Sequence, residues 1–176
     1  MSRLVNQLLQ LALADRHKES LHLEEFDLSE LTEMVAEEAQ GLAESKAVTL
    51  TAEIEPGILV KADQTLMMRI WLNLLTNAVK YGRQQGQIWL TLKSDGKNAV
   101  GTVGDDGIGI SAAELPKIWK RFYRVNTARS SGDDSGTGLG LAMVKWMVES
   151  HGGTVSAVST LGAGSTFSFT IPLRPS

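Results

Sequence analysis

Apolar residues recur every three or four positions in several stretches of the chain, which is the spacing of a helix with one buried face. Asp27 and Asp63 each stand just before such a stretch, where an aspartate side chain caps a helix N-terminus. Gly82 follows the longest stretch, at a position where glycine commonly ends a helix. The spacing predicts helices over residues 4–14, 28–42, 64–81, 111–121 and 139–150.

Other stretches alternate apolar and polar residues with a period of two, as half-buried strands do. Asp95-Gly96 and the residues 161–164 each separate two such runs, and both predict hairpin turns. The alternation predicts strands over residues 21–26, 48–54, 58–61, 88–92, 100–103, 154–158 and 166–171. Helices mixed with antiparallel strands favour an α+β fold: a two-layer α/β sandwich whose mixed, mainly antiparallel sheet carries helices on one face.

The helix expected over residues 4–14 is apolar along two neighbouring stripes, as in a helical bundle. Eleven residues cannot form a bundle alone, so we expect this segment to be the end of a longer helix. A docking helix is the alternative. The remaining chain is long enough for one domain with its own core.

Composition removes several classes of function. The chain has no cysteine, which excludes disulfides, thiol nucleophiles and cysteine zinc sites. Its formal net charge of −3 argues against a nucleic-acid partner, and no apolar run approaches the roughly 18 residues of a membrane span. His17, His22 and His151 share no metal-binding spacing, so we expect exposed polar residues there.

A narrow polar stripe runs along the apolar helix expected over residues 64–81. At about 100° per residue, Asn77 lies roughly 40° from Asn73, Lys80 lies about 20° to the other side, and Tyr81 flanks them. Asparagine is a poor helix former, and amide oxygens can ligate Mg²⁺ while a lysine can meet a phosphate. The solvent-exposed face of an ordinary amphipathic helix explains the stripe equally well. This segment alone therefore leaves open whether the stripe is a binding site or a solvated surface.

Two glycine-rich segments follow. Asp105, Gly107 and Gly109 come directly after a strand, where an aspartate could accept a hydrogen bond from a base and the glycines could let a ring approach. A tight turn is the alternative. The run 136–140 (GTGLG) opens a helix, and its N–H groups suit a phosphate. The polar stretch before it carries Arg124 and is typical of a lid or of a plain loop.

The order of these segments resembles the catalytic domain of sensor histidine kinases, within the ATPase group that includes gyrase, MutL-type proteins and heat-shock chaperones. NLLTNAVKYG, DDGIGI, IWKRFYR and GTGLGL follow one another as they do in that family, and FDLSEL and the closing GGTVSAVSTLGAGSTFSFTIPL agree with its flanks. The resemblance implies a Bergerat-type ATP-binding fold with a flexible lid. It also implies that residues 1–18 are the C-terminal end of a dimerisation/phosphoacceptor helix and that residues 19–176 form the catalytic domain.

The resemblance further implies roles for individual residues. Asn77, with support from Asn73, would hold Mg²⁺, and Lys80 would meet the phosphates of ATP or ADP. Asp105 would bind the adenine amino group, and Arg121 and Arg124 would assist the lid or the transfer. The implied nucleotide-binding set is Asn73, Asn77, Lys80, Tyr81, Asp105, Gly107, Gly109, Gly136, Thr137, Gly138, Leu139 and Gly140, and the implied catalytic set is Asn77, Lys80, Arg121 and Arg124.

The sequence departs from the family pattern in two places. Trp119 and Lys120 replace a more usual phenylalanine and acidic residue, and no histidine carries the phosphoacceptor motif. We therefore expect a cytoplasmic domain, without direct membrane contact, that phosphorylates a histidine on a separate dimerisation domain and so serves a response regulator. The parent protein could be anchored in the inner membrane. An ATPase clamp and a non-catalytic partner-binding module remain alternatives, although Asn73 stands where a clamp needs glutamate.

Overall fold

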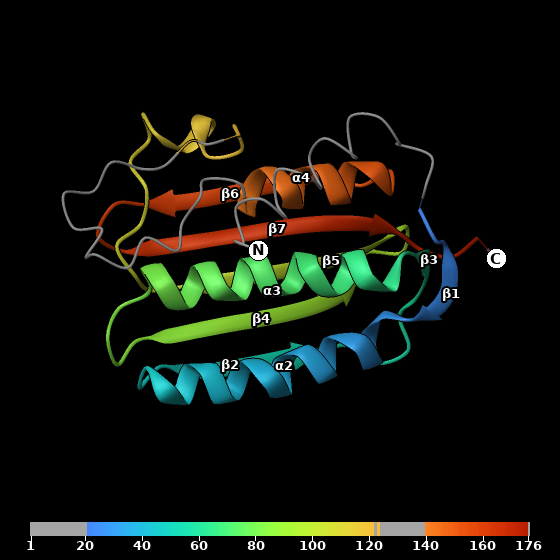
Figure 1. Ribbon diagram of the computed structural model, residues 1–176, viewed down its shortest axis with the longest axis horizontal. Helices are drawn as coiled ribbons and strands as arrows, with labels where there is room; N and C mark the ends of the chain where they lie inside the picture. Colours follow the sequence, from blue (N-terminus) through green and yellow to red (C-terminus); the bar gives the residue numbers. More distant parts are fainter. Residues whose placement is uncertain (1–20, 122, 124–139, 176) are drawn as a thin grey trace, which may run out of the picture.

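A layer of helices covers one face of a β-sheet in the computed structural model, which describes residues 21–121, 123 and 140–175 (Figure 1). The helices described are α2 (Leu28–Ser45), α3 (Gln64–Tyr81), α4 (Gly140–Ser150) and the short 3₁₀ helix η1 (Leu115–Lys117). The strands are β1 (Glu24–Asp27), β2 (Thr49–Ile54), β3 (Leu59–Ala62), β4 (Gln87–Ser94), β5 (Asn98–Asp105), β6 (Val155–Thr160) and β7 (Gly164–Pro172). The predicted α+β sandwich is confirmed.

The main sheet has five strands in the order β2-β4-β5-β7-β6. Only β2 and β4 run parallel, and the other neighbours are antiparallel, which confirms the mixed, mainly antiparallel sheet. The expectation of a single sheet is wrong in one respect. β1 and β3 pair with each other as a separate two-stranded sheet, with Phe26 opposite Val60.

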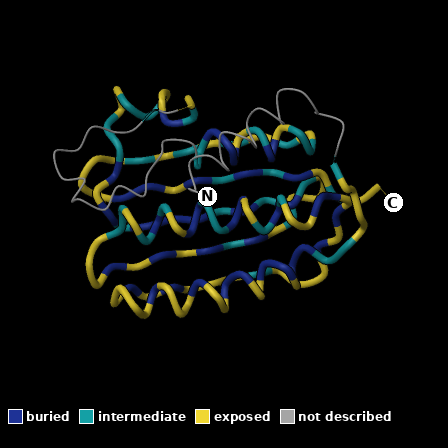
Figure 2. Tube along the Cα trace, in the orientation of Figure 1, coloured by how far each residue is buried: buried dark blue, intermediate teal, exposed yellow. Residues whose placement is uncertain are grey.

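The core lies between the helices and the inner face of the main sheet (Figure 2). Alternate residues of β4, β5 and β7 face inward in rows, one of which joins Leu90, Val103 and Phe167. Trp71 of α3 packs edge-on against Phe169, with ring centroids 4.9 Å apart. These contacts fix the position of α3 over the centre of the sheet.

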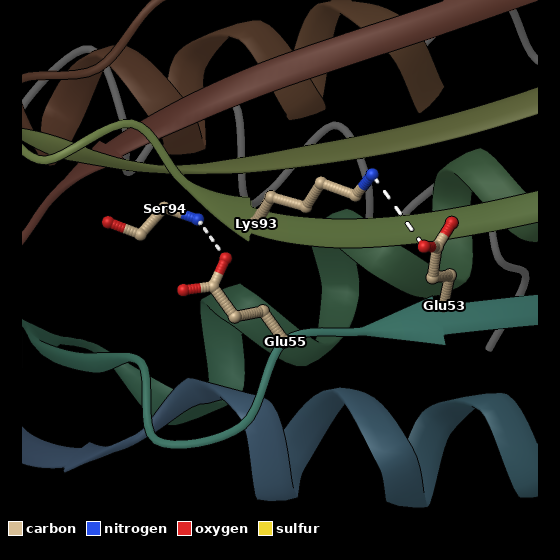
Figure 3. A network of polar contacts seen from close by, with 4 residues as sticks. All are labelled: Glu53, Glu55, Lys93 and Ser94. Carbon is tan, nitrogen blue, oxygen red and sulfur yellow. Dashed lines mark hydrogen bonds and ion pairs between the residues drawn. The ribbon is translucent and has the colours of Figure 1, made fainter.

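The outer face and the β2 edge are polar by comparison. At that edge Lys93 pairs with Glu53 at 3.8 Å, and the backbone N–H of Ser94 donates to Glu55 Oε2 at 3.0 Å (Figure 3). Both members of the ion pair are exposed, so it adds little stability. The Glu55 bond helps to hold the one parallel strand pair in register.

Helix starts and the end of α3 follow the local sequence, whereas one other local prediction needs correction. Asp27 accepts hydrogen bonds from the N–H groups of Ser29 and Glu30, and Asp63 accepts one from Leu66. Gly82 ends α3 as predicted, with extended φ and ψ of −70° and 164°. The helix predicted over residues 111–121 is reduced to η1, because Pro116 has no N–H to continue the helical bonding.

Candidate functional site

The polar stripe of α3 lies at the border of the core. Asn73 and Asn77 are half-buried, while Leu74 and Ala78 beside them are fully buried. Within residues 21–121, 123 and 140–175, neither amide side chain has a hydrogen-bond partner. Lys80 is exposed, and its ammonium lies 5.2 Å from the centroid of the Tyr81 ring. The stripe therefore offers two available amides and a cation on one side of the helix.

The end of α3 meets the loop that follows β5, which brings two of the predicted segments together. The N–H of Ile108 donates to the carbonyl oxygen of Tyr81 at 3.2 Å. A side chain at Gly107 would collide with that same carbonyl oxygen and with Gly82. Tyr81 and residues 105–109 at the end of β5 and just after it, called the Asp105 loop below, are thus held against each other by backbone contacts.

Asp105 is a buried acid at the end of β5. It is only 7% exposed, and its Oδ1 accepts a 2.8 Å hydrogen bond from the N–H of Gly107. Burial raises the pKa of Asp105, the N–H groups of Gly107 and Ser165 oppose that rise, and the charge of Asp106 adds to it. Such a carboxyl gains from a ligand that donates a hydrogen bond to it, because a donor compensates the charge that burial disfavours.

Both glycines after Asp105 have a packing reason within the protein itself. Gly109 adopts a φ of +70°, and a side chain there would collide with the carbonyl oxygen of Thr160 and crowd Leu161. The β6–β7 turn is further tied to this loop by the N–H of Gly162, which donates to the carbonyl oxygen of Ile108 at 2.7 Å. The glycines hold the loop against its neighbours, and the idea that they admit a ring stays a prediction.

Sequence reasoning missed a polar row at the same end of the sheet. Asp105 lies opposite Ser165 on β7, and Ser165 lies opposite Ser159 on β6. Both serines lie just outside the strands predicted over residues 154–158 and 166–171, so the alternation does not mark them. Arg83, which donates to the carbonyl oxygen of Gly162 at 3.3 Å, was missed as well.

The remaining predicted residues lie at the edge of the site or outside the described part of the chain. Gly140 opens α4, and among the described residues beyond its own helix no atom lies within 4 Å of the point that a side-chain Cβ would occupy there. Arg121 is exposed. Trp119 packs edge-on against Phe167 at 6.2 Å, which shows that the larger ring fits the core edge. Outside the described residues lie Arg124, Gly136, Thr137, Gly138, Leu139 and the segment 1–18.

The donor set suits a magnesium ion that arrives with a nucleotide. Among the described residues, no group of three or more His, Asp or Glu side chains is placed to hold a metal. Asn73 and Asn77 offer neutral oxygens only, and Mg²⁺ commonly combines few protein ligands with phosphate oxygens and water. The phosphates would then supply the negative charge.

Among the described residues, no helix has the length and apolarity needed to cross a membrane.

Comparison with known proteins shows the family to which the chain belongs. A family model described as histidine kinase-, DNA gyrase B-, and HSP90-like ATPase matches residues 62–175. The sensor histidine kinase TmoS of Ectopseudomonas mendocina is 38% identical over 171 residues, which cover 97% of this chain and 18% of the relative. The sensor histidine kinase WalK of Bacillus subtilis is 32% identical over 176 residues, which cover 99% of this chain and 29% of the relative.

Solved structures of similar chains share the fold. Full-length ShkA in complex with AMPPNP has a TM-score of 0.84 and 29% identity, with 98% of this chain and 36% of that chain covered. The mycobacterial sensor histidine kinase MprB has a TM-score of 0.76 and 28% identity, with 87% of this chain and 100% of that chain covered. The chain spans less than a third of the length of TmoS or WalK.

Proposed function

Because the chain belongs to the histidine kinase-, DNA gyrase B-, and HSP90-like ATPase family, we propose that it binds Mg²⁺-ATP as the catalytic domain of a sensor histidine kinase. The observation that carries the proposal is the contact between the end of α3 and the Asp105 loop. That contact joins a buried acceptor to a helix with two available amides and a lysine.

Each end of the site has a distinct task in this proposal. Asp105 accepts a hydrogen bond from the amino group of the base. Asn77, supported by Asn73, holds Mg²⁺ through its amide oxygen, and Lys80 meets the phosphates. Bound Mg²⁺-ATP supplies the phosphoryl group, and the protein contributes mainly position and charge compensation.

The phosphoryl acceptor is a histidine on a dimerisation domain, and the two described histidines of this chain do not suit that role. Both ring nitrogens of His151 are occupied: Nε2 accepts from the N–H of Asp63 at 3.0 Å, and Nδ1 bonds the carbonyl oxygen of Met147 at 2.7 Å. His151 is therefore a structural bridge, which corrects the expectation of a merely exposed residue. His22 is exposed but lacks the family's acceptor motif.

The relatives also support a proposal about further partners. Sensor histidine kinases act in two-component systems, so we propose that the parent protein passes the phosphoryl group to a response regulator. A cytoplasmic location fits the use of ATP. The segment 1–18 is proposed to end the dimerisation helix, with residues 19–176 as the catalytic domain.

Nucleotide titration of the 176-residue chain tests the proposal. Wild type should bind ATP in the presence of Mg²⁺, and Asp105→Asn should weaken binding about tenfold or more, because the amide offers a poorer acceptor and a misplaced donor. Asp106→Asn is the matched control, since Asp106 lies next to Asp105 but uses its Oδ1 for the N–H of Gln87. Equal affinities of wild type and Asp105→Asn would contradict the assignment of the base site.

A second pair of variants tests the metal end. Asn77→Ala should weaken ATP binding with Mg²⁺ present and change it little in EDTA, because the amide acts through the ion. Thr76→Ala, an exposed neighbour on α3, is the control. The same loss with and without Mg²⁺ would argue against Asn77 as a ligand. Steady ATP hydrolysis by the chain alone would favour the clamp over the kinase.

A further inference from the structure

The inner face of the main sheet changes from apolar to polar at its last row. Val103, Phe167 and Ala157 form one cross-strand row on β5, β7 and β6. The next row towards the site consists of Asp105, Ser165 and Ser159. Asp105 and Ser165 are each only 7% exposed, so the row forms a polar border to the core beside the site.

Ser159 uses the whole hydrogen-bonding capacity of its hydroxyl within the protein. The N–H of Ile110 donates to Ser159 Oγ at 2.7 Å, and Ser159 Oγ donates to the carbonyl oxygen of Gly164 at 2.9 Å. Ser165 Oγ lies 2.8 Å from the same oxygen of Ser159. A serine hydroxyl has one donor and two acceptor positions, so all three are filled.

This arrangement fixes the direction of the next hydrogen bond. The carbonyl oxygen of Gly164 can only accept, so it takes the single proton of Ser159. Ser165 must therefore donate its proton to Ser159, and its own oxygen keeps only lone pairs for any other partner. Ser165 lies opposite Asp105 in the strand register and provides a second acceptor there, and Ser159 fixes the Ser165 oxygen in this accepting role.

We propose that Ser159 is a positioning residue that makes the base site selective for a 6-aminopurine over a 6-oxopurine. It acts by holding Ser165 as an acceptor beside Asp105, and by holding the Asp105 loop through Ile110. An amino group offers donors to these acceptors, whereas an oxo group brings a third acceptor against them. The inference rests on the proposed function, because it assumes that the purine of ATP lies at Asp105.

The test compares ATP with inosine triphosphate, which carries an oxo group in place of the 6-amino group. Affinities of both nucleotides are measured by titration with Mg²⁺ for wild type and for Ser159→Ala. Loss of Ser159 frees the proton of Ser165 to turn towards Asp105 or the base, so the preference for ATP should fall by about fivefold. Ser159→Thr keeps a hydroxyl and should retain the preference.

Matched variants separate this role from a merely structural one. Ser156→Ala makes the same change on an exposed position of β6 and should leave both affinities unchanged. Ser165→Ala should lower the preference as Ser159→Ala does, and adding Ser159→Ala to it should lower the preference no further. The Ser165→Ala variant also leaves the bonds of Ser159 to Ile110 and Gly164 intact, so it serves if Ser159→Ala does not fold.

The outcomes distinguish this inference from the proposed function. If wild type binds neither nucleotide, the proposed function fails. If wild type binds ATP and Ser159→Ala weakens both nucleotides by the same factor, Ser159 only supports the loop and the inference is overturned. An unchanged preference in Ser165→Ala would overturn it as well.

Discussion

Gly101 on β5 lies under the two rings that support α3, and its replacement by alanine gives a sharp test of the core. A side-chain carbon there would lie 2.8 Å from Cη2 of Trp71 and closer still to the ring of Phe169. The two residues are 0% and 1% exposed and are stacked edge-on. Neither ring has free space to move into, so the whole helix–sheet contact must adjust.

Two opposing effects set the size of the change. Inserting a carbon into a packed core costs about 1–3 kcal/mol, and contacts this short point to the upper part of that range. Alanine in place of glycine returns about 0.5–1 kcal/mol by restricting the unfolded chain. Gly101→Ala should therefore lower the free energy of unfolding by about 1–2 kcal/mol, which corresponds to roughly 2–8 °C in Tm for a domain of this size.

Gly104→Ala is the matched control on the same strand. A side-chain carbon at Gly104 would meet Thr166 Oγ1 at 3.2 Å and Trp89 Cε3 at 3.6 Å on the outer face. Trp89 is 42% exposed and can move aside, so this variant should stay within about 0.5 kcal/mol of wild type.

The free energy of unfolding of wild type, Gly101→Ala and Gly104→Ala is measured by urea denaturation followed by circular dichroism. In a double-mutant cycle, Phe169→Leu should cost less in the Gly101→Ala background, because a smaller side chain leaves room for the added carbon. The reasoning is refuted if Gly101→Ala is as stable as wild type, or if Gly104→Ala is the more damaging change.

Two further predictions concern buried polar groups. Burial raises the pKa of Asp105 above 3.8, so the stability linked to its protonation is complete below that value and is lost as the pH rises through the raised pKa. Without ligand, Asp105→Asn should therefore be more stable than wild type at pH 7, and an advantage that did not shrink towards pH 4 in urea titrations would contradict this cause. His151→Ala should lower the free energy of unfolding by about 1–2 kcal/mol, because the N–H of Asp63 loses its acceptor. His22→Ala should have little effect in the same assay, since His22 contacts Asp63 through its backbone N–H.

Local signals predicted the fold where the physical cause is local. An aspartate before an apolar helical repeat caps that helix whatever the rest of the chain does, and Asp27 and Asp63 do so. The pairing of β1 with β3 depends on residues more than thirty positions apart, such as Phe26 and Val60, and no short-range pattern encodes it. The 3₁₀ helix η1 is a different case, because Pro116 is a local signal that lies inside the stretch for which periodicity predicted a helix over residues 111–121.

The site was predictable only in part for a related reason. The Asn73 and Asn77 stripe and the Asp105 loop stand out because their residue types are unusual at those positions. Ser159 does not, because serine on an alternating strand is typical of a solvated face. Its role appears only when the register places Ser159 opposite Ser165 and next to Ile110.

The polar row and the perturbed pKa of Asp105 are two consequences of one arrangement. A carboxyl that ends the inner face of a sheet loses water on the side that packs against the core, so its charge is disfavoured. The N–H groups of Gly107 and Ser165 offset only part of that cost. Ser165 cannot offset more, because its hydroxyl proton is held by Ser159. The Asp105 carboxylate therefore has too few hydrogen-bond donors in the protein to offset its desolvation. A ligand amino group that donates a hydrogen bond to it compensates part of this desolvation cost on binding.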